Sequence, residues 1–99
     1  MKNYVIQSEK LEMGASMLRA MAHPMRIAII ELLTATKRLS VTEIYEKLHI
    51  EQASASHHLN ILKNKGVLES KREGQKIFYS LKHDKLTGII DSLDRCLGL

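Results

Sequence analysis

The chain has 99 residues, which is enough for one domain with a single core and little more. Its composition of 44% hydrophobic and 26% charged residues is that of an ordinary globular protein, and no apolar run approaches the roughly 18 residues that a membrane span needs. The formal net charge of +4 favours polyanionic partners but does not indicate a fold. The single cysteine excludes a framework of internal disulfides. The first residues lack a signal-peptide pattern, so a cytoplasmic protein is expected.

No repeat and no Gly/Ser/Pro-rich linker divides the chain, so residues 1–99 are predicted to form one domain. The two ends, about 8–22 and 84–97, are predicted to be helices with more apolar side chains than a small domain can cover. These side chains are Leu11, Met13, Ala15, Met17, Leu18 and Met21 in the first, and Leu86, Ile89, Ile90, Leu93 and Leu97 in the last. A helix that is apolar around much of its girth is buried on more than one side. The pattern therefore predicts a homodimer joined through the first and last helices.

A second helix is predicted from Pro24 to about Thr34. The residue before a proline avoids the helical region, and proline suits a first helical turn, so His23-Pro24 marks the boundary. Apolar residues at a spacing of three predict the inner face, made of Ile27, Ile30 and Leu33.

A helix-turn-helix is predicted over residues 41–65. Ser40 and Glu43 have the spacing of a capping box, with Leu39 and Ile44 at the hydrophobic staple positions, so a third helix starts here. It runs to about Leu48 and buries Ile44 and Leu48. The fourth helix runs from about Gln52 to Lys65, and Gly66 is predicted to end it in the left-handed conformation. Its buried stripe consists of Ala55, Leu59 and Leu62.

Residues 67–81 change to the pattern of a β-hairpin. Residues 67–72 and 76–81 are strand candidates, and Glu73-Gly74-Gln75 forms the turn between them. The predicted class is mainly α with a β-hairpin wing, which is a winged helix-turn-helix.

The exposed side of the fourth helix is polar and nearly uncharged, as the recognition of base edges in a major groove requires. The candidates for base contacts are Gln52, Ser54, Ser56, His57 and Asn60. Cations on the flanks suit phosphate contacts; they are Lys63, Lys65, Lys71, Arg72 and Lys76. Either group alone is also compatible with an ordinary solvated surface.

His57 and His58 are adjacent on this helix and therefore point about 100° apart. They are not expected to bind one ligand together. His57 is predicted to face outward, and His58 to pack against the base of the hairpin or the second helix.

Three stretches of the chain resemble the ArsR/SmtB family of small bacterial repressors. They are Leu18-Arg19-Ala20-Met21-Ala22-His23-Pro24-Met25-Arg26-Ile27, then Ser54-Ala55-Ser56-His57-His58-Leu59-Asn60-Ile61-Leu62-Lys63 followed by Gly66-Val67-Leu68, and the wing from Lys71 to Leu81. The resemblance covers roughly residues 18–93. It implies a winged-helix dimer joined through the first and last helices, and operator binding that an inducer relieves.

The sensor positions of that family differ in this chain. Where many members have Cys-x-Cys, this sequence has Ser40 and Thr42, which supply no thiolates. The residues at a second family site are His83-x-Lys85 and Cys96-x-x-Leu99 in this sequence. Glu31 stands where a thiol-redox subset of the family has a cysteine. At most two of the four places in the second site hold a possible ligand, whereas a closed tetrahedral site needs four. No metal site and no cofactor is therefore predicted.

Cys96 is open to three interpretations. It is a small hydrophobic residue in the dimer interface, a lone redox-sensitive thiol, or a metal ligand together with His83 or Asp84.

The predicted function is that of a sequence-specific repressor that binds double-stranded DNA as a homodimer on a palindromic operator, with a metal or redox inducer left open. The alternative is a winged-helix protein-interaction module without DNA binding. The sequence contains no nucleophile–base pair and no Gly-rich phosphate loop, so an enzyme is not expected.

Overall fold

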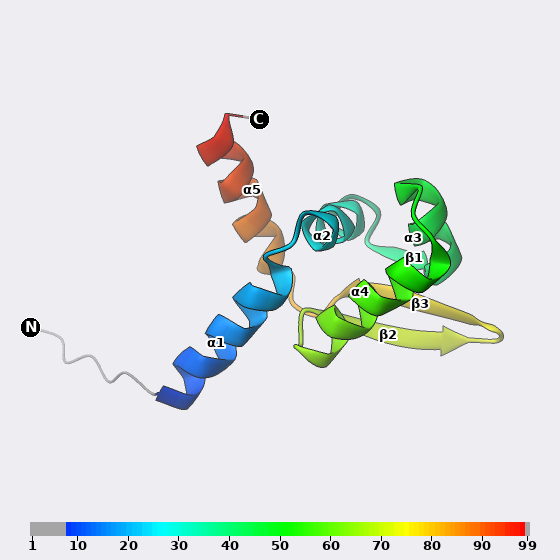
Figure 1. Ribbon diagram of the computed structural model, residues 1–99, viewed down its shortest axis with the longest axis horizontal. Helices are drawn as coiled ribbons and strands as arrows, with labels where there is room; N and C mark the ends of the chain where they lie inside the picture. The colour runs from blue at the N-terminus through cyan, green and yellow to red at the C-terminus, as the bar shows by residue number, and fades with distance from the viewer. Residues whose placement is uncertain (1–7, 99) are drawn as a thin grey trace, which may run out of the picture.

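The computed structural model describes residues 8–98, except for the side chains of Ile90 and Asp94. Parts of the predicted domain 1–99, namely residues 1–7 and 99, and the predicted apolar side chain of Ile90 lie outside this description. The elements are α1 (Ser8–Met21), α2 (Pro24–Thr36), β1 (Arg38–Ser40), α3 (Val41–Leu48), α4 (Gln52–Asn64), β2 (Leu68–Glu73), β3 (Lys76–Leu81) and α5 (Leu86–Leu97). Figure 1 shows α1 and α5 diverging at one end of the molecule and the β2–β3 hairpin extending from the other.

The core is centred on α2, which contacts every other helix as well as β1 and β3. His23 has extended backbone angles and caps the helix by accepting a hydrogen bond from the backbone N–H of Met25, as expected at a boundary before proline. The buried side chains of α2 are Ile29, Ile30 and Leu33, while Ile27 is half-buried. The predicted inner face was therefore too narrow, because a helix surrounded on several sides buries more than one stripe.

The sheet has three strands in the order β1-β3-β2, and all pairs are antiparallel. The hairpin was predicted, but β1 was not. β1 is three residues long and pairs Leu39 with Tyr79, so it joins the sheet through backbone hydrogen bonds to a distant segment. Three residues are too few to show the alternation by which a strand is predicted.

The capping box at the start of α3 is confirmed. The side chain of Ser40 accepts from the backbone N–H of Glu43 at 3.2 Å, and the backbone N–H of Ser40 donates to the Glu43 carboxylate at 3.0 Å. That backbone hydrogen bond is the main reason why the pKa of Glu43 is lowered. Ile44 is fully buried as predicted, whereas Leu48 is only half-buried.

The remaining boundaries agree closely with the prediction. Gly66 follows α4 with φ of 79°, a left-handed conformation that glycine adopts without strain. α5 begins at Leu86, two residues later than predicted, because residues 83–85 form a turn in which the hydroxyl and backbone N–H of Thr87 both donate to the carbonyl of Asp84.

Candidate nucleic-acid interface

α4 has one fully buried side and one exposed side. Ala55, Leu59 and Leu62 are 0% exposed and pack into the core. Of the predicted base-contacting residues, Gln52, Ser54, His57 and Asn60 are exposed and Ser56 is half-buried. The exposed edge therefore offers hydrogen-bonding groups on a rigid support, which is the geometry of a recognition helix.

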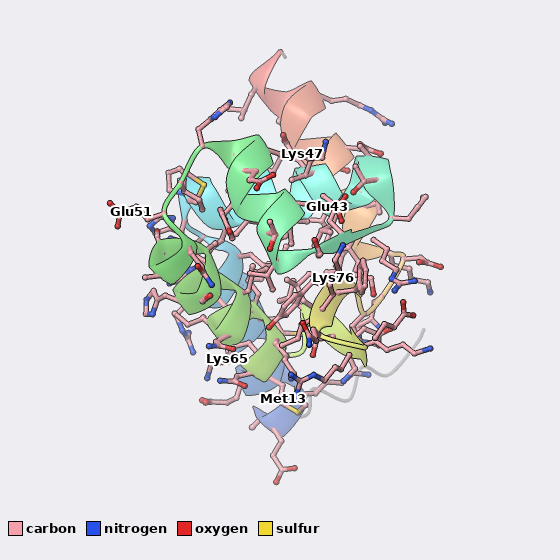
Figure 2. The ribbon with its side chains drawn as sticks, turned by 90° about the vertical axis from the view of Figure 1, so that its right-hand side faces the viewer. Met13, Glu43, Lys47, Glu51, Lys65 and Lys76 are labelled. Carbon is pink, nitrogen blue, oxygen red and sulfur yellow. The ribbon has the colours of Figure 1, made fainter. Side chains whose placement is uncertain are left out.

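A polar cleft of about 280 Å³ lies between the start of α3, the first turns of α4 and the tip of the hairpin. It is lined by Ser40, Val41, Thr42, Gln52, Ser56, Gln75, Lys76 and Ile77. Figure 2 shows Lys76 on the hairpin below Glu43 of α3, with Glu51 and Lys65 at opposite ends of α4. The cleft thus brings two predicted base-contacting residues together with one predicted phosphate-contacting residue.

The other predicted cations do not share this cleft. Lys71 pairs with Phe78 and Arg72 with Ile77 across the hairpin, so the two cations lie on opposite faces of β2. Arg72 is on the face of Ile77, which lines the cleft, whereas Lys71 lines a separate hollow with Arg38 and Phe78. The basic run of the wing is therefore divided between two surfaces.

Lys63, in the last turn of α4, and Lys65, which caps the C-terminal end of the helix, are both exposed. Lys65 lines a hollow beside α1 together with Met13, Met17 and His83. Lys63 and Lys65 flank the recognition edge from the end away from the cleft.

Sequence reasoning missed Arg38 and Gln75. Arg38 stacks on Phe78, with its guanidinium carbon 3.9 Å from the ring centroid, and forms an ion pair with Glu73. Both contacts depend on the pairing of β1 with β3, which no local pattern indicated. Gln75 was noted only as a turn residue, although it also lines the cleft.

The two adjacent histidines have different environments, as predicted. His57 is exposed, while His58 is 8% exposed and packs against α2. Arg26 Nε donates a hydrogen bond to Nδ1 of His58 at 3.1 Å. Burial is the main reason why the pKa of His58 is lowered, and the nearby charges of His23, Arg26 and His57 lower it further.

The residues considered for a metal site do not converge. His83 and Asp84 precede α5, whereas Cys96 is near its other end, and all three are exposed. With a rise of about 1.5 Å per residue, the ten residues from Leu86 to Cys96 separate these groups by roughly 15 Å. One protomer therefore does not bring them onto one ion, and the described side chains, which exclude that of Asp94, contain no cluster of three His, Cys, Asp or Glu residues that could hold a metal.

The fold and this surface together define a winged helix-turn-helix DNA-binding regulator. A family profile described as "Helix-turn-helix domain" matches residues 21–71. The chain is 39% identical to the transcriptional repressor PagR of Bacillus anthracis over 92 residues, which are 93% of this chain and 92% of PagR. It is also 39% identical to the repressor SmtB of Mycobacterium tuberculosis over 82 residues, 83% of this chain and 60% of SmtB.

Two solved structures are also similar to this chain. The crystal structure of PagR matches with a TM-score of 0.80 at 40% identity, covering 88% of this chain and 99% of PagR. HlyU of Vibrio cholerae matches with a TM-score of 0.81 at 28% identity, covering 94% of this chain and all of HlyU (100%). The chain belongs to the ArsR/SmtB family of winged-helix transcriptional repressors. Within residues 8–98, no helix is long and apolar enough to cross a membrane.

Proposed function

We propose that this repressor binds a palindromic operator as a homodimer, with α4 of each protomer in a major groove. The observation that carries the proposal is the combination of an uncharged polar edge on α4 with the adjoining cleft that contains Lys76. Successive major grooves on one side of B-DNA place the half-site centres about 34 Å apart.

The base contacts are assigned to the exposed edge of α4, made of Gln52, Ser54, Ser56, His57 and Asn60. Gln52 and Ser56 also line the cleft, so they lie where the DNA backbone would pass from α4 to the hairpin. Amide and imidazole groups both donate and accept hydrogen bonds, which allows them to distinguish base pairs in the major groove.

The phosphate contacts are assigned mainly to Lys76, which lines the cleft, and to Arg72, which lies on the hairpin face of Ile77, another residue of the cleft lining. Lys63 and Lys65 would contact the backbone at the other end of α4. Lys71 contributes less, because it lines a separate hollow with Arg38 and Phe78 rather than the cleft beside α4.

The homodimer is assigned to α1 and α5. Large apolar side chains on these helices are exposed in the protomer; they are Leu11, Met13 and Leu18 of α1, and Ile89, Leu93 and Leu97 of α5. A second copy that covers these side chains stabilises the assembly, because it removes apolar surface from water.

Operator binding is proposed to require no metal or cofactor, and the protein to act in the cytoplasm without enzymatic activity. At the start of α3, Ser40 is engaged in the capping box and Thr42 is an exposed hydroxyl, so this position supplies no thiolate for a metal. If an inducer exists, it acts by binding the two states of the dimer with different affinities.

The test is a fluorescence anisotropy titration of reduced, chelator-treated protein against a duplex from upstream of its own gene. A scrambled duplex is the control, and each titration is run at two salt concentrations. Tight binding to the native duplex alone would support the proposal. Equal and weak binding to both would contradict it and favour a protein-interaction module.

The residue assignments are tested in the same assay. The double variant Gln52→Ala with His57→Ala is expected to lower the preference for the operator while it retains binding to the scrambled duplex. An equal loss on both duplexes would contradict base recognition by α4.

A further inference from the structure

The side chain of Arg26 connects three helices. Its Nε donates to Nδ1 of His58 on α4 at 3.1 Å, and its Nη1 donates to the backbone carbonyl of Ala20, near the end of α1, at 3.0 Å. Arg26 itself is half-buried on α2, while Ala20 and His58 are 5% and 8% exposed. One guanidinium group therefore connects the end of the proposed dimerisation helix to the recognition helix.

The hydrogen bond to His58 requires one particular form of the imidazole ring. Because Nδ1 accepts a hydrogen bond from the Nε–H of Arg26, it carries no proton of its own, and the neutral ring holds its proton on Nε2. A second proton would go to Nδ1, where it would face the N–H of Arg26. Protonation therefore replaces a hydrogen bond by two opposed donors and places a second positive charge beside the guanidinium.

The surroundings of His58 oppose that second proton. The groups whose charges act on it are His23 from the α1–α2 connection, Arg26 from α2 and His57 from its own helix, and all of them disfavour its charged form. The ring of His23 is 4.7 Å from that of His58 between centroids, and the ring of His57 is 5.6 Å away. Among the described side chains, the charged groups that act on His58 include no carboxylate that would compensate for the added charge.

His58 is also placed where a displacement would affect DNA binding. Its neighbours in sequence are His57, on the exposed edge of α4, and Leu59, which is fully buried. A shift of the ring away from Arg26 would move or rotate the first turns of α4 relative to α1. In a dimer, such a shift changes the separation of the two recognition helices, which has to match the spacing of the half-sites.

We propose that Arg26 and His58 are positioning residues that hold the recognition helix against α1, and that protonation of His58 weakens sequence-specific DNA binding in mildly acidic solution. The inference rests on the proposed function, because it assumes that α4 recognises the operator. A histidine whose pKa is lowered in the folded protein is mainly neutral above its ordinary pKa of 6.5 in both the folded and the unfolded protein. Its contribution to the binding-competent fold is therefore complete above pH 6.5 and is lost as the pH falls through the lower pKa.

The experiment measures the ratio of operator to scrambled-duplex affinity at pH 7.5, 6.5 and 5.5 and constant ionic strength. For the wild-type protein we expect the ratio to fall as the pH drops from 7.5 to 5.5, because protonation of His58 replaces its hydrogen bond from Arg26 by two opposed donors. Binding to the scrambled duplex reports the general electrostatic effect of pH on DNA binding. The ratio therefore separates loss of positioning from a general electrostatic effect.

Two variants separate the effect of His58 on the affinity ratio from the effects of other histidines. His58→Asn keeps a side-chain acceptor for Arg26 but does not titrate, so its ratio is expected to fall less with pH than that of the wild type. His49→Asn is the matched control, because His49 is exposed at the left-handed end of α3, where asparagine is well tolerated. It should keep the pH dependence of the wild type. Circular dichroism at each pH verifies that all three proteins remain folded.

A pH-dependent ratio in His58→Asn equal to that of the wild type would overturn the proposal. If that variant does not fold, nitrogen NMR of the wild-type histidine rings decides the question. We expect Nδ1 of His58 to be unprotonated at pH 7.5, and a proton on that atom would overturn the proposal. Absence of any operator preference at every pH would instead contradict the proposed function, while the NMR result would still test the Arg26–His58 contact.

Discussion

The two halves of the protomer differ in how completely they are packed. In the half formed by α3, α4 and the hairpin, large apolar side chains such as Ile44 and Leu59 are fully buried, and the exposed surface is mostly polar apart from Ile77, which is 40% exposed. In the terminal helices, Leu18 is 57% exposed and Leu97 is 67% exposed. α1 buries only Ala20 and Met21 of its fourteen residues.

This difference separates two requirements of a small repressor. The half that contacts DNA has to be rigid within each protomer, because base recognition depends on the accurate placement of side chains. The terminal helices leave apolar surface exposed because, in the proposed dimer, a second copy covers it. The rigidity of the DNA-contacting half comes from packing within the single chain, whereas the apolar surface of the terminal helices is buried by assembly of the dimer.

The largest effect is expected from a charge in the proposed interface. In Leu93→Glu, association would bury an unpaired carboxylate, so the dimer dissociation constant should rise by a factor on the order of 100 or more. Sedimentation velocity over a range of concentrations measures this change. Arg95→Glu is the matched control: Arg95 lies two residues further on and thus about 200° around the helix from Leu93. If both variants remained dimeric, the interface would have to lie elsewhere.

A core truncation tests the packed half. Leu59→Ala removes a side chain that is 0% exposed, and such changes lower the free energy of unfolding by about 2–5 kcal/mol. Urea denaturation measures this change in the free energy of unfolding. Asn60→Ala, on the exposed edge, should change stability by less than about 0.5 kcal/mol and instead weaken operator binding. Equal reductions in stability would contradict the separation of a buried and an exposed side of α4.

The capping box should give a smaller effect. Ser40→Ala removes the acceptor for the Glu43 backbone N–H, which costs about 0.5–2 kcal/mol of folding free energy. Because the pKa of Glu43 is lowered by the Ser40 backbone N–H, its contribution to stability is present above pH 4.5 and is lost as the pH falls. Urea titrations at several pH values should therefore show a weaker acid dependence in Glu43→Gln. An unchanged dependence would mean that other carboxylates account for it.

The smallest effect concerns the two faces of the hairpin. Arg72→Ala, on the face of Ile77, should reduce the slope of log affinity against log salt by about 0.9 for each phosphate that the variant no longer neutralises. Lys71→Ala, on the opposite face of β2, should change the slope less. Anisotropy titrations at four salt concentrations measure both slopes. A larger effect for Lys71 would place the DNA on the other face of the sheet.

What could be predicted from the sequence was set by local interactions. The capping box joins Ser40 to a residue three positions away, and the buried stripe of α4 repeats within one helix, so both are visible in the sequence. The exposed edge of α4 follows directly from that stripe. The order of the helices was also accessible, because several helix boundaries have a residue signal, such as His23-Pro24.

What was missed depends on contacts between distant segments. β1 exists because Leu39 meets Tyr79, forty residues away, and Arg38 reaches Phe78 through the same pairing. The bond between Arg26 and His58 spans 32 residues, so the sequence could suggest burial of His58 but not its partner. The division of the wing cations between two faces required the strand register, which places Lys71 beside Phe78 and Arg72 beside Ile77.

The central claim is that two protomers joined through α1 and α5 place two α4 helices on one operator. Sedimentation velocity with a fluorescent duplex tests it most directly, by comparing a full operator with a single half-site. The account predicts two chains on the full site and binding to the half-site that is weaker by orders of magnitude. One chain per duplex, with equal affinity for both, would contradict it.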